Sequence, residues 1–338
     1  VAMENILNLI HTHALAISTT ILIVAYIFIA WEKISKVTVA MIGAAITLML
    51  GLLAQSKGHE AAIDPHYFIN FVDFNVIFLL VSMMIIVSIA SKSGIFTWIA
   101  NALLKKTKGH PVKILLVLGF FTAVASAFLD NVTTVILVVP ITFLVAKYLD
   151  INPLPYLITE ILASNIGGTA TLIGDPPNII IGTSLGYSFK DFILNTGMMA
   201  GVSLIFVVLF FYFSFRKELK ASEKHDEAVT YPSPQEAIAD RKRFAVSVVI
   251  FATAIVMLVT HAQTGLTVAT IGVFIGAFSL LASGGEALSM IKKLDYKTLL
   301  FFIGLFVVVG GMEQTGVLNS LAGIIDAVSG NNVKWVVA

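Results

Sequence analysis

The sequence predicts an all-α polytopic membrane protein built from inverted-topology repeats, each with a re-entrant helical hairpin and a discontinuous helix. Of its 338 residues, 58% are hydrophobic and only 12% are charged, and the mean hydropathy is +0.95. A soluble domain carries about 25% charged residues, so this composition excludes that class. Short motifs also recur in the same order in two parts of the chain, and clusters of polar, Gly and Pro residues interrupt two apolar regions.

The apolar runs give the expected spans. Runs of roughly 17 to 25 residues are candidates for transmembrane helices, and we place such helices at 14–30, 37–54, 72–90, 192–215, 244–260, 266–282 and 298–312. Two shorter amphipathic segments, 95–104 and 317–328, are expected to lie along the membrane interface. Two further apolar regions, 114–146 and 155–185, do not have the pattern of single helices.

The basic residues predict the orientation of these spans. Lys and Arg concentrate in cytoplasmic loops, and placing residues 31–36 in the cytoplasm puts 18 of the 21 basic residues on that side. The long hydrophilic stretch 216–243 is then a cytoplasmic linker. The expected location is the inner membrane of a bacterial or archaeal cell.

An internal repeat organises the chain. TVAMIG at 38–43 resembles TVATIG at 267–272, and 21 residues separate both Asp73 from Gly94 and Asp295 from Gly316. Val-Lys at 112–113 and at 333–334 extends the match. The predicted spans run in opposite directions in the two copies, which is an architecture of secondary transporters.

The repeat predicts three regions. Residues 14–215 form the first transmembrane repeat, with the hairpin at 114–146 and the broken helix at 155–185. Residues 216–243 form the linker, and residues 244–338 form the start of the second repeat. By symmetry we expect this second copy to be truncated by roughly 80 to 100 residues, which include its own broken helix.

The first interrupted region is 114–146. A single helix of this length would extend about 50 Å, beyond a bilayer core of about 30 Å. Lys113 and Lys147 flank it, so the chain enters and returns on one side, with Asp130 and Asn131 near the turn. A re-entrant hairpin fits best, although two short spanning helices have the same parity.

The second interruption is 164–178, which reads SNIGGTATLIGDPPN. Irregular backbone survives at membrane depth only where it is buried in protein or lines a cavity, and broken helices build the ion and substrate sites of many transporters. Unwound carbonyls suit a hard cation such as Na⁺, whereas half-helix N-termini suit an anion or a polarised neutral substrate. The Pro pair at 176–177 can begin the second half-helix.

These two segments supply the candidate ion-binding and substrate-binding residues. They are Asp130, Asn131, Thr133 and Thr134 from the hairpin tip, and Ser164, Asn165, Gly167, Gly168, Thr169, Thr171, Gly174, Asp175 and Asn178 from the break. Helix capping is the structural alternative for the two aspartates. Glu160 is a candidate proton relay, with a helix cap or a cytoplasm-facing position as its alternative. No catalytic residue and no cofactor is expected, and the only metal expected is a transported or coupling Na⁺.

A family resemblance follows from these motifs. AFLDNVTTVILVVPI and SNIGGTATLIGDPPNIIIG resemble the two signature regions of the ArsB/NhaD branch of the ion transporter superfamily, and are most similar to its P-protein-like and arsenite-permease-like members. The resemblance implies a site between the hairpin tip and the loop of the broken helix. Related dicarboxylate carriers use Ser-Asn-Thr motifs, whereas Val132 and Ile166 stand at comparable places here. That departure, and the lack of an intramembrane Arg or Lys, argue against a di- or tricarboxylate substrate.

The leading hypothesis is therefore a secondary active transporter of an inorganic ion. It is similar either to an arsenite/antimonite efflux permease or to a sodium/proton antiporter, with substrate and coupling ion bound at midmembrane. The alternatives are an anion or dicarboxylate (citrate-like) carrier and a passive ion channel. An intramembrane aspartic protease is disfavoured because Leu172 breaks the required GxGD context. The expected partners are the transported ion, a coupling cation or proton, the lipid bilayer and a second copy in a homodimer, with no nucleic acid.

Overall fold

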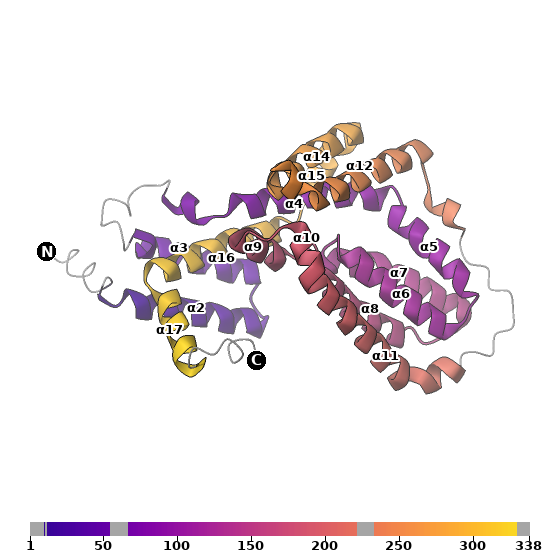
Figure 1. Cartoon of the computed structure of the whole chain (residues 1–338), viewed down its shortest axis with the longest axis horizontal. Coiled ribbons are helices and arrows are strands. Elements are labelled where there is room, and N and C mark those ends of the chain that lie inside the picture. Colours follow the sequence, from indigo (N-terminus) through magenta and orange to yellow (C-terminus); the bar gives the residue numbers. More distant parts are fainter. Residues whose placement is uncertain (1–9, 11, 55–66, 222–232, 330–338) are drawn as a thin grey trace. The chain divides into compact units, whose positions relative to one another are not determined.

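Helices make up every regular element in the described part of the chain (Figure 1). The computed structural model describes residues 10, 12–54, 67–221 and 233–329. These residues fall into two compact units: unit 1 comprises Val1–Ile77 and Asp295–Ala338, and unit 2 comprises Phe78–Leu294. The two units are defined by contacts within the chain, whereas the predicted repeats are defined by sequence motifs. The units therefore do not test the repeat boundaries, which stay a prediction.

Unit 1 joins the beginning of the chain to its end. Its helices are α2 (Ala14–Trp31), α3 (Lys36–Met49), η1 (Leu52–Ala54), η3 (Tyr67–Phe71), α16 (Tyr296–Gln314) and α17 (Val317–Ser329). Helix α16 packs mainly against α3 and also contacts α2 and η1. The α3–α16 pair therefore forms the centre of this unit.

Unit 2 holds the remaining helices, and α4 starts just before its boundary. They are α4 (Phe74–Lys92), α5 (Ile95–Thr107), α6 (Pro111–Ser126), α7 (Asn131–Leu149), α8 (Leu154–Gly168), α9 (Pro176–Leu185), α10 (Phe189–Phe192), η4 (Ile193–Gly197), α11 (Met198–Ala221), η6 (Pro234–Ala237), α12 (Arg241–Val259), α13 (His261–Thr264), α14 (Val268–Ser283), η7 (Gly284–Glu286) and α15 (Ala287–Lys292). Helix α8 packs against α6, α7 and α11, and α12 packs against α14. These contacts place α8 at the centre of a group of four helices.

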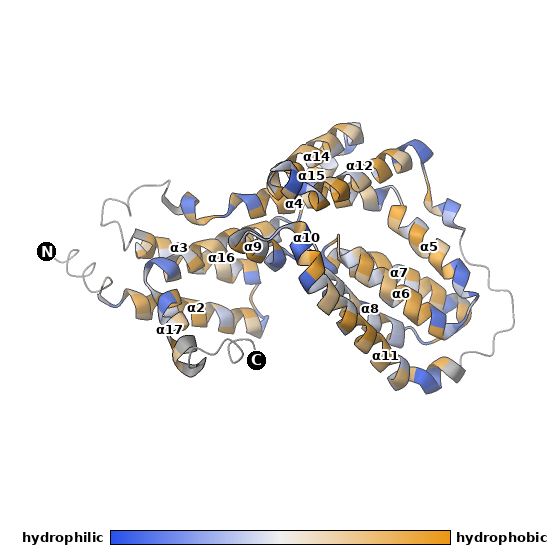
Figure 2. Cartoon of the chain, in the orientation of Figure 1, coloured by the Kyte–Doolittle hydropathy of each residue, from blue (hydrophilic) through white to orange (hydrophobic). Residues whose placement is uncertain are grey.

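Among the described residues, six helical stretches are long and apolar enough to cross a membrane, and the chain is an integral membrane protein. They are Ala14–Trp31, Phe74–Lys92, Phe189–Leu219, Arg241–Val259, Val268–Lys292 and Tyr296–Gln314, and they correspond to six of the seven predicted spans. Figure 2 shows that hydrophobic residues dominate these helices. Large apolar side chains such as Phe206 and Phe210 are exposed on α11, as expected of a surface that faces lipid.

The seventh predicted span, 37–54, is shorter than expected. Helix α3 has 14 residues and ends at Met49, which corresponds to a length of about 21 Å. Gly51 adopts a left-handed backbone with φ of 64°, and a glycine in this conformation commonly ends a helix. The apolar pattern continues to residue 54, so hydropathy alone overestimated this helix.

The two interrupted regions each contain two helices. The predicted hairpin 114–146 corresponds to α6 and α7, which pack against each other. The predicted broken helix 155–185 corresponds to α8 and α9, with residues 169–175 between them. Whether α6 and α7 re-enter the membrane or cross it stays a prediction.

The predicted linker 216–243 is only partly a free segment. Helix α11 continues to Ala221, residues 222–232 lie outside the described residues, and η6 packs against α5. Gly94, with φ of 85°, lets the carbonyl of Ala237 approach so closely that a β carbon would collide with it. The predicted repeat match at 333–334 also lies outside the described residues.

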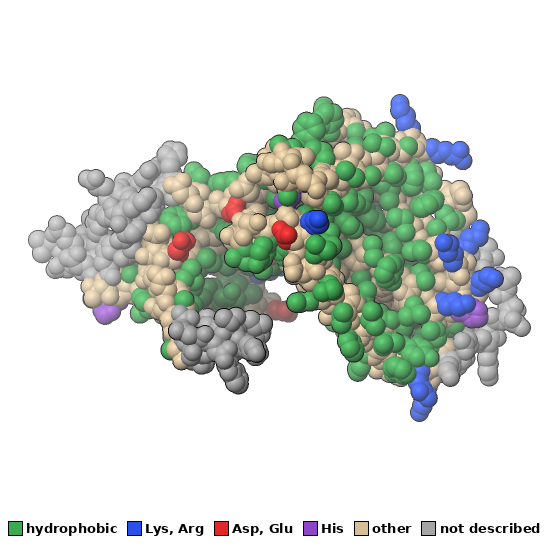
Figure 3. Space-filling model, in the orientation of Figure 1, with side chains coloured by type: hydrophobic (Ala, Val, Ile, Leu, Met, Phe, Trp, Pro, Cys, Tyr) green, Lys and Arg blue, Asp and Glu red, His purple; other side chains and the backbone are tan. Residues whose placement is uncertain are grey.

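Basic side chains gather at one end of unit 2. Figure 3 shows most of its Lys and Arg side chains over the ends of α5, α11 and α12, whereas hydrophobic side chains cover much of the remaining surface in this view. This is the distribution expected of a membrane protein whose basic end faces the cytoplasm.

Candidate ion and substrate site

The turn between α6 and α7 is organised by Asp130, which caps α7. One oxygen of its carboxylate accepts a hydrogen bond from the amide of Thr133 at 2.9 Å, and its carbonyl accepts one from the hydroxyl of Thr134 at 2.9 Å. Capping satisfies amides that have no partner within the helix. Asp130 therefore does cap a helix, as the structural alternative proposed, and capping uses only one of its two carboxylate oxygens.

The interruption between α8 and α9 is held together by buried polar side chains. The amide group of Asn178 donates hydrogen bonds of 2.8 Å to the carbonyls of Gly168 and Thr171. The amide of Gly174 donates to the hydroxyl of Thr171 at 3.2 Å. Asn178 and Thr171 therefore fold the loop back onto the end of α8.

Three glycines allow this loop to pack without side chains. A β carbon on Gly167 would collide with the carbonyl of Ala123 on α6, and one on Gly174 would collide with the carbonyl of Gly168. A β carbon on Gly168 would lie 2.7 Å from the carboxylate carbon of Asp175. The chain can make these approaches only with glycine at these positions.

The two interrupted regions meet, as is required of a site shared by the α6–α7 turn and the α8–α9 loop, called here the two-part site. The side-chain amide of Asn131 donates a hydrogen bond of 2.8 Å to the side-chain oxygen of Asn165. The hydroxyl of Thr171 donates to the carbonyl of Ala127. The carboxylate of Asp175 lies beside the backbone amide of Asn131 and close enough to Asp130 for the two charges to interact.

The remaining predicted residues divide by exposure. Asn165 and Thr169 are exposed, and Thr133 is half-buried like Asp130, Asn131 and Asp175, so these six side chains can reach a bound ligand. Ser164 and Thr134 are buried. The hydroxyls of Ser164 and Thr169 donate to carbonyls of α8 at 2.8 Å.

Glu160 lies away from this loop, in the packed interior around α8. It is fully buried, the hydroxyl of Thr142 on α7 donates to one of its oxygens, and its other oxygen has no partner among the described residues. Eight residues separate it from Gly168, which corresponds to about 12 Å along the helix. Sequence reasoning missed Thr142; a threonine two residues after Pro140 in an apolar helix was the available signal.

The two interrupted regions, 114–146 and 155–185, contain carboxylates but no Lys or Arg. The lysines that flank the first region, Lys113 and Lys147, lie near the far ends of α6 and α7. No cluster of three or more metal-ligating His, Asp or Glu side chains occurs among the described residues. An ion in this site would depend on the two carboxylates, on side-chain oxygens and on loop carbonyls.

Comparison with known proteins gave matches along most of the chain. The family model CitMHS, described as citrate transporter, matches residues 26–338. An uncharacterized transporter of Mycobacterium tuberculosis is 36% identical over 324 residues, which are 94% of this chain and 72% of that protein. A 46 kDa membrane protein of Mycobacterium leprae is 35% identical over 319 residues, with the same two coverages. The human P protein is 35% identical over 199 residues, which are 57% of this chain and 23% of that protein.

Proposed function

The chain belongs to the CitMHS citrate transporter family and is thus a secondary transporter and not an enzyme; from this premise we propose that it binds substrate and coupling ion between the α6–α7 turn and the α8–α9 loop. The match to the human P protein agrees with the P-protein-like resemblance of the motifs. The family model names citrate rather than arsenite. The identity of the substrate therefore has to be argued from the site.

The proximity of Asp130 and Asp175 carries the proposal. Two carboxylates from separate segments interact electrostatically, and the segments that hold them contain no Lys or Arg. Like charges this close repel one another unless a cation or a proton lies between them. We therefore assign these two residues to a coupling cation, Na⁺ or H⁺, with the side-chain oxygens of Asn131 and Asn165 beside it as further ligands.

The substrate that fits this charge best is an inorganic cation or a small neutral species. Sodium/proton exchange uses the two carboxylates directly, and neutral arsenite would meet no electrostatic barrier. Free citrate would carry its negative charges towards two carboxylates with no basic side chain to pair with, which is unfavourable.

Citrate remains the second candidate because the family model names it. It suits the site only if its charge is reduced first. A complex of citrate with a divalent cation carries less negative charge and presents the cation to Asp130 and Asp175. This form reconciles the family match with a site that lacks Lys and Arg.

Glu160 is assigned to proton movement. Ionisable residues inside membrane proteins commonly form proton relays, and Glu160 is buried beside Thr142 with one oxygen unused. Its place along α8 lies between the loop and the helix end near Lys147. A proton released from the site would have a carboxyl group to receive it along this helix.

Transport by the full chain in proteoliposomes tests the proposal. A proton gradient is imposed, internal pH is followed, and Na⁺, arsenite, free citrate or citrate with Mg²⁺ is added outside. Proton movement that needs Na⁺ alone identifies an antiporter, whereas movement that needs citrate and Mg²⁺ together identifies the metal–citrate complex. Arsenite flux that needs no cation, retained after Asp130→Asn and Asp175→Asn, would contradict the cation site.

Cation binding to purified variants supplies an independent measurement. Asp130→Asn and Asp175→Asn should each weaken binding of the active cation at least about tenfold, because a contact with a charged group contributes roughly 1.5–3 kcal/mol. Asp150→Asn is the matched control: Asp150 caps the far end of α7 in a left-handed conformation that Asn also tolerates. Glu160→Gln should keep cation binding and lose proton movement. Equal cation affinities in all four variants would contradict the assignment of Asp130 and Asp175 to the cation site.

A further inference from the structure

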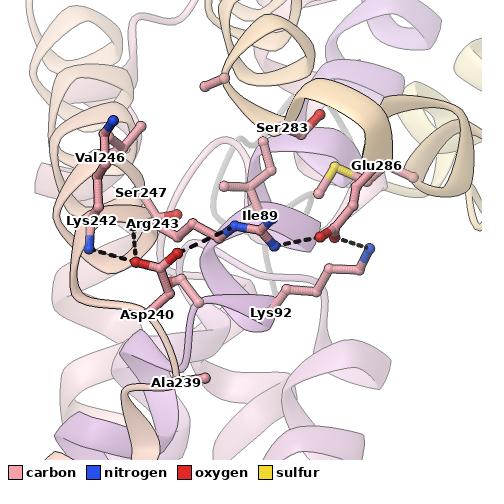
Figure 4. A pocket seen from close by; sticks show the side chains of 13 residues that line it. Ile89, Lys92, Ala239, Asp240, Lys242, Arg243, Val246, Ser247, Ser283 and Glu286 are labelled. Carbon is pink, nitrogen blue, oxygen red and sulfur yellow. Dashed lines mark hydrogen bonds and ion pairs between the residues drawn. The ribbon is translucent and has the colours of Figure 1, made fainter.

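A cavity lies at the basic end of unit 2, and none of the residues that line it belongs to the two-part site. It has a volume of about 360 Å³, within the range of roughly 300–1,000 Å³ typical of small-ligand pockets. Its walls come from the last turns of α4 and α14, the first turns of α12, and the short helices η7 and α15 (Figure 4). Ends of three candidate membrane spans therefore meet around it.

The polarity of the cavity changes along the helix axes. On α12, Lys242 and Arg243 line it at the helix end, and Val246 lines it one turn deeper. On α4, Lys92 lies at the helix end and Ile89 one turn deeper. A charged mouth above an apolar floor matches a ligand with a charged head and an apolar body.

Ion pairs neutralise part of the charge of the basic side chains that line the cavity. Glu286 lies between Lys92, at 3.3 Å, and Arg243, with which it also forms an ion pair (Figure 4). Asp240 caps α12 by accepting from the amides of Lys242 and Arg243 at 2.8 and 3.2 Å, and it pairs with the side chain of Arg243 at 3.6 Å.

The cavity keeps one positive charge in excess. Three basic and two acidic residues line the cavity, and among the described residues no carboxylate pairs with the ammonium of Lys242. A single negative charge would balance the mouth. Val246, which lines the cavity, is also 38% exposed, so an apolar chain can pass from the floor to the lipid-facing surface.

We propose that this cavity binds an anionic phospholipid, with its phosphodiester at Lys242 and Arg243 and an acyl chain along Val246. Basic pockets between transmembrane helices are suited to anionic headgroups. A phosphodiester carries the one charge that the mouth lacks. The proposal is independent of the transported substrate, because none of these residues belongs to the two-part site.

Lipid binding to the full-length chain in neutral detergent micelles tests this inference. Thermal unfolding is followed while phosphatidylglycerol, phosphatidylcholine with the same acyl chains, or soluble glycerol phosphate is added. Phosphatidylglycerol should raise the midpoint temperature in a saturable manner, and the other two should not. Equal shifts with the two lipids would overturn the proposal, and a shift with glycerol phosphate alone would assign the cavity to a soluble anion.

Two lysine variants locate the effect. Lys242→Ala should weaken the apparent affinity for phosphatidylglycerol about fivefold, since one basic residue near an anionic lipid contributes about 1 kcal/mol. Lys293→Ala removes an exposed lysine that does not line the cavity, and its affinity should match that of the unmodified chain. Equal losses in both variants would indicate general attraction to anionic surfaces and would overturn the assigned site.

Discussion

The α3–α16 pair of unit 1 and the α14–α4 pair of unit 2 use the same short motif in different ways. TVAMIG lies in α3 and TVATIG lies in α14, and each motif glycine packs against a helix that begins beside an aspartate, Asp295 or Asp73. By the predicted repeats, each pair joins the motif helix of one copy to the second helix of the other. The exchange is reciprocal, as expected of two related copies, and the inversion of the copies stays a prediction.

In unit 1, α16 supplies the glycines. A β carbon on Gly304 would lie 2.9 Å from the backbone of Ala40, and one on Gly311 would lie 2.6 Å from the methyl group of Thr47. A β carbon on the motif glycine, Gly43, would lie 3.2 Å from a methyl group of Val308. Small residues let two helices approach closely, and here the approach brings backbone against backbone.

In unit 2, the motif helix itself supplies the glycines. A β carbon on Gly272 would lie 3.0 Å from the end of Leu79 and 3.3 Å from Ser82, and one on Gly276 would lie 3.3 Å from Ser82. Ser82 and Gly304 both stand nine residues after their aspartates. Ser82 contacts Gly272, the motif glycine of α14. Gly304 instead contacts Ala40, which precedes Gly43, the motif glycine of α3, by three residues. The two pairs are thus offset by about one helical turn.

The largest expected effect is on unit 1. Gly304→Ala should destabilise the protein by about 2 to 3 kcal/mol, because the new methyl group meets backbone that cannot rotate away. Thermal unfolding in detergent measures this loss. Gly201→Ala on α11 is the control: its β carbon meets no atom within 4 Å, so it should gain up to about 1 kcal/mol from helix propensity. Equal stability of the two variants would contradict the close α3–α16 approach.

Cysteine pairs measure the offset directly, because the chain has no native cysteine. Gly43→Cys with Val308→Cys should form a disulfide, and so should Gly272→Cys with Ser82→Cys, since both pairs are in contact. Ile86 is the repeat counterpart of Val308. Gly272→Cys with Ile86→Cys should therefore cross-link several-fold less. A yield equal to that of the unit 1 pair, read on a gel after mild oxidation, would place both helix pairs in one register.

A smaller effect is expected at the motif glycine of unit 2. In Gly272→Ala the methyl group meets the flexible end of Leu79, and a packing cost of about 1 kcal/mol is offset by a helix-propensity gain of similar size. Its unfolding midpoint should therefore stay close to that of the unmodified chain. A loss as large as that of Gly304→Ala would mean that the two helix pairs are equally tight.

The smallest effect concerns pH and unit 2 alone. The amide of Phe189 donates to Nε2 of His261 at 3.1 Å, which requires that nitrogen to be unprotonated. Burial lowers the pKa of His261 below its ordinary value of 6.5. The unfolded state therefore binds the proton first as pH falls below about 6.5, and the stabilisation present at higher pH is lost.

Hydrogen exchange at pH 7 and pH 5, corrected for intrinsic rates, measures this loss. Protection near Phe189 should decrease at pH 5, while α3 in unit 1 should be unchanged. His261→Gln should remove the difference, and a variant that kept the full pH dependence would exclude His261 as its source.

The predictability of each part depends on how local its cause is. The loop after Gly168 was predictable because Gly and Pro interrupt an apolar run. Each of these residues disfavours a helix through the conformation of its own backbone, independently of distant contacts. The end of α3 at Met49 was not predictable, because the glycine that ends the helix, Gly51, lies within a run that stays apolar to residue 54.

Contacts between distant segments were predictable only in outline. The meeting of the two interrupted regions followed from the architecture, whereas the bond between Asn131 and Asn165 depends on the rotation of two helices. The cavity beside Lys242 combines residues from three separated helix ends, and each of these alone has the appearance of an ordinary loop charge.

The nested glycines of the α8–α9 loop also limit how this transporter could acquire a new specificity. Gly167, Gly168 and Gly174 each face backbone or a carboxylate where a β carbon would collide, so mutation there would deform the loop before it altered ligand selection. Exposed positions such as Asn165 and Thr169 can change without that cost. Adaptation to a different ion would therefore proceed through side chains on an invariant backbone, and selection experiments should recover variants at the rim of the loop rather than within it.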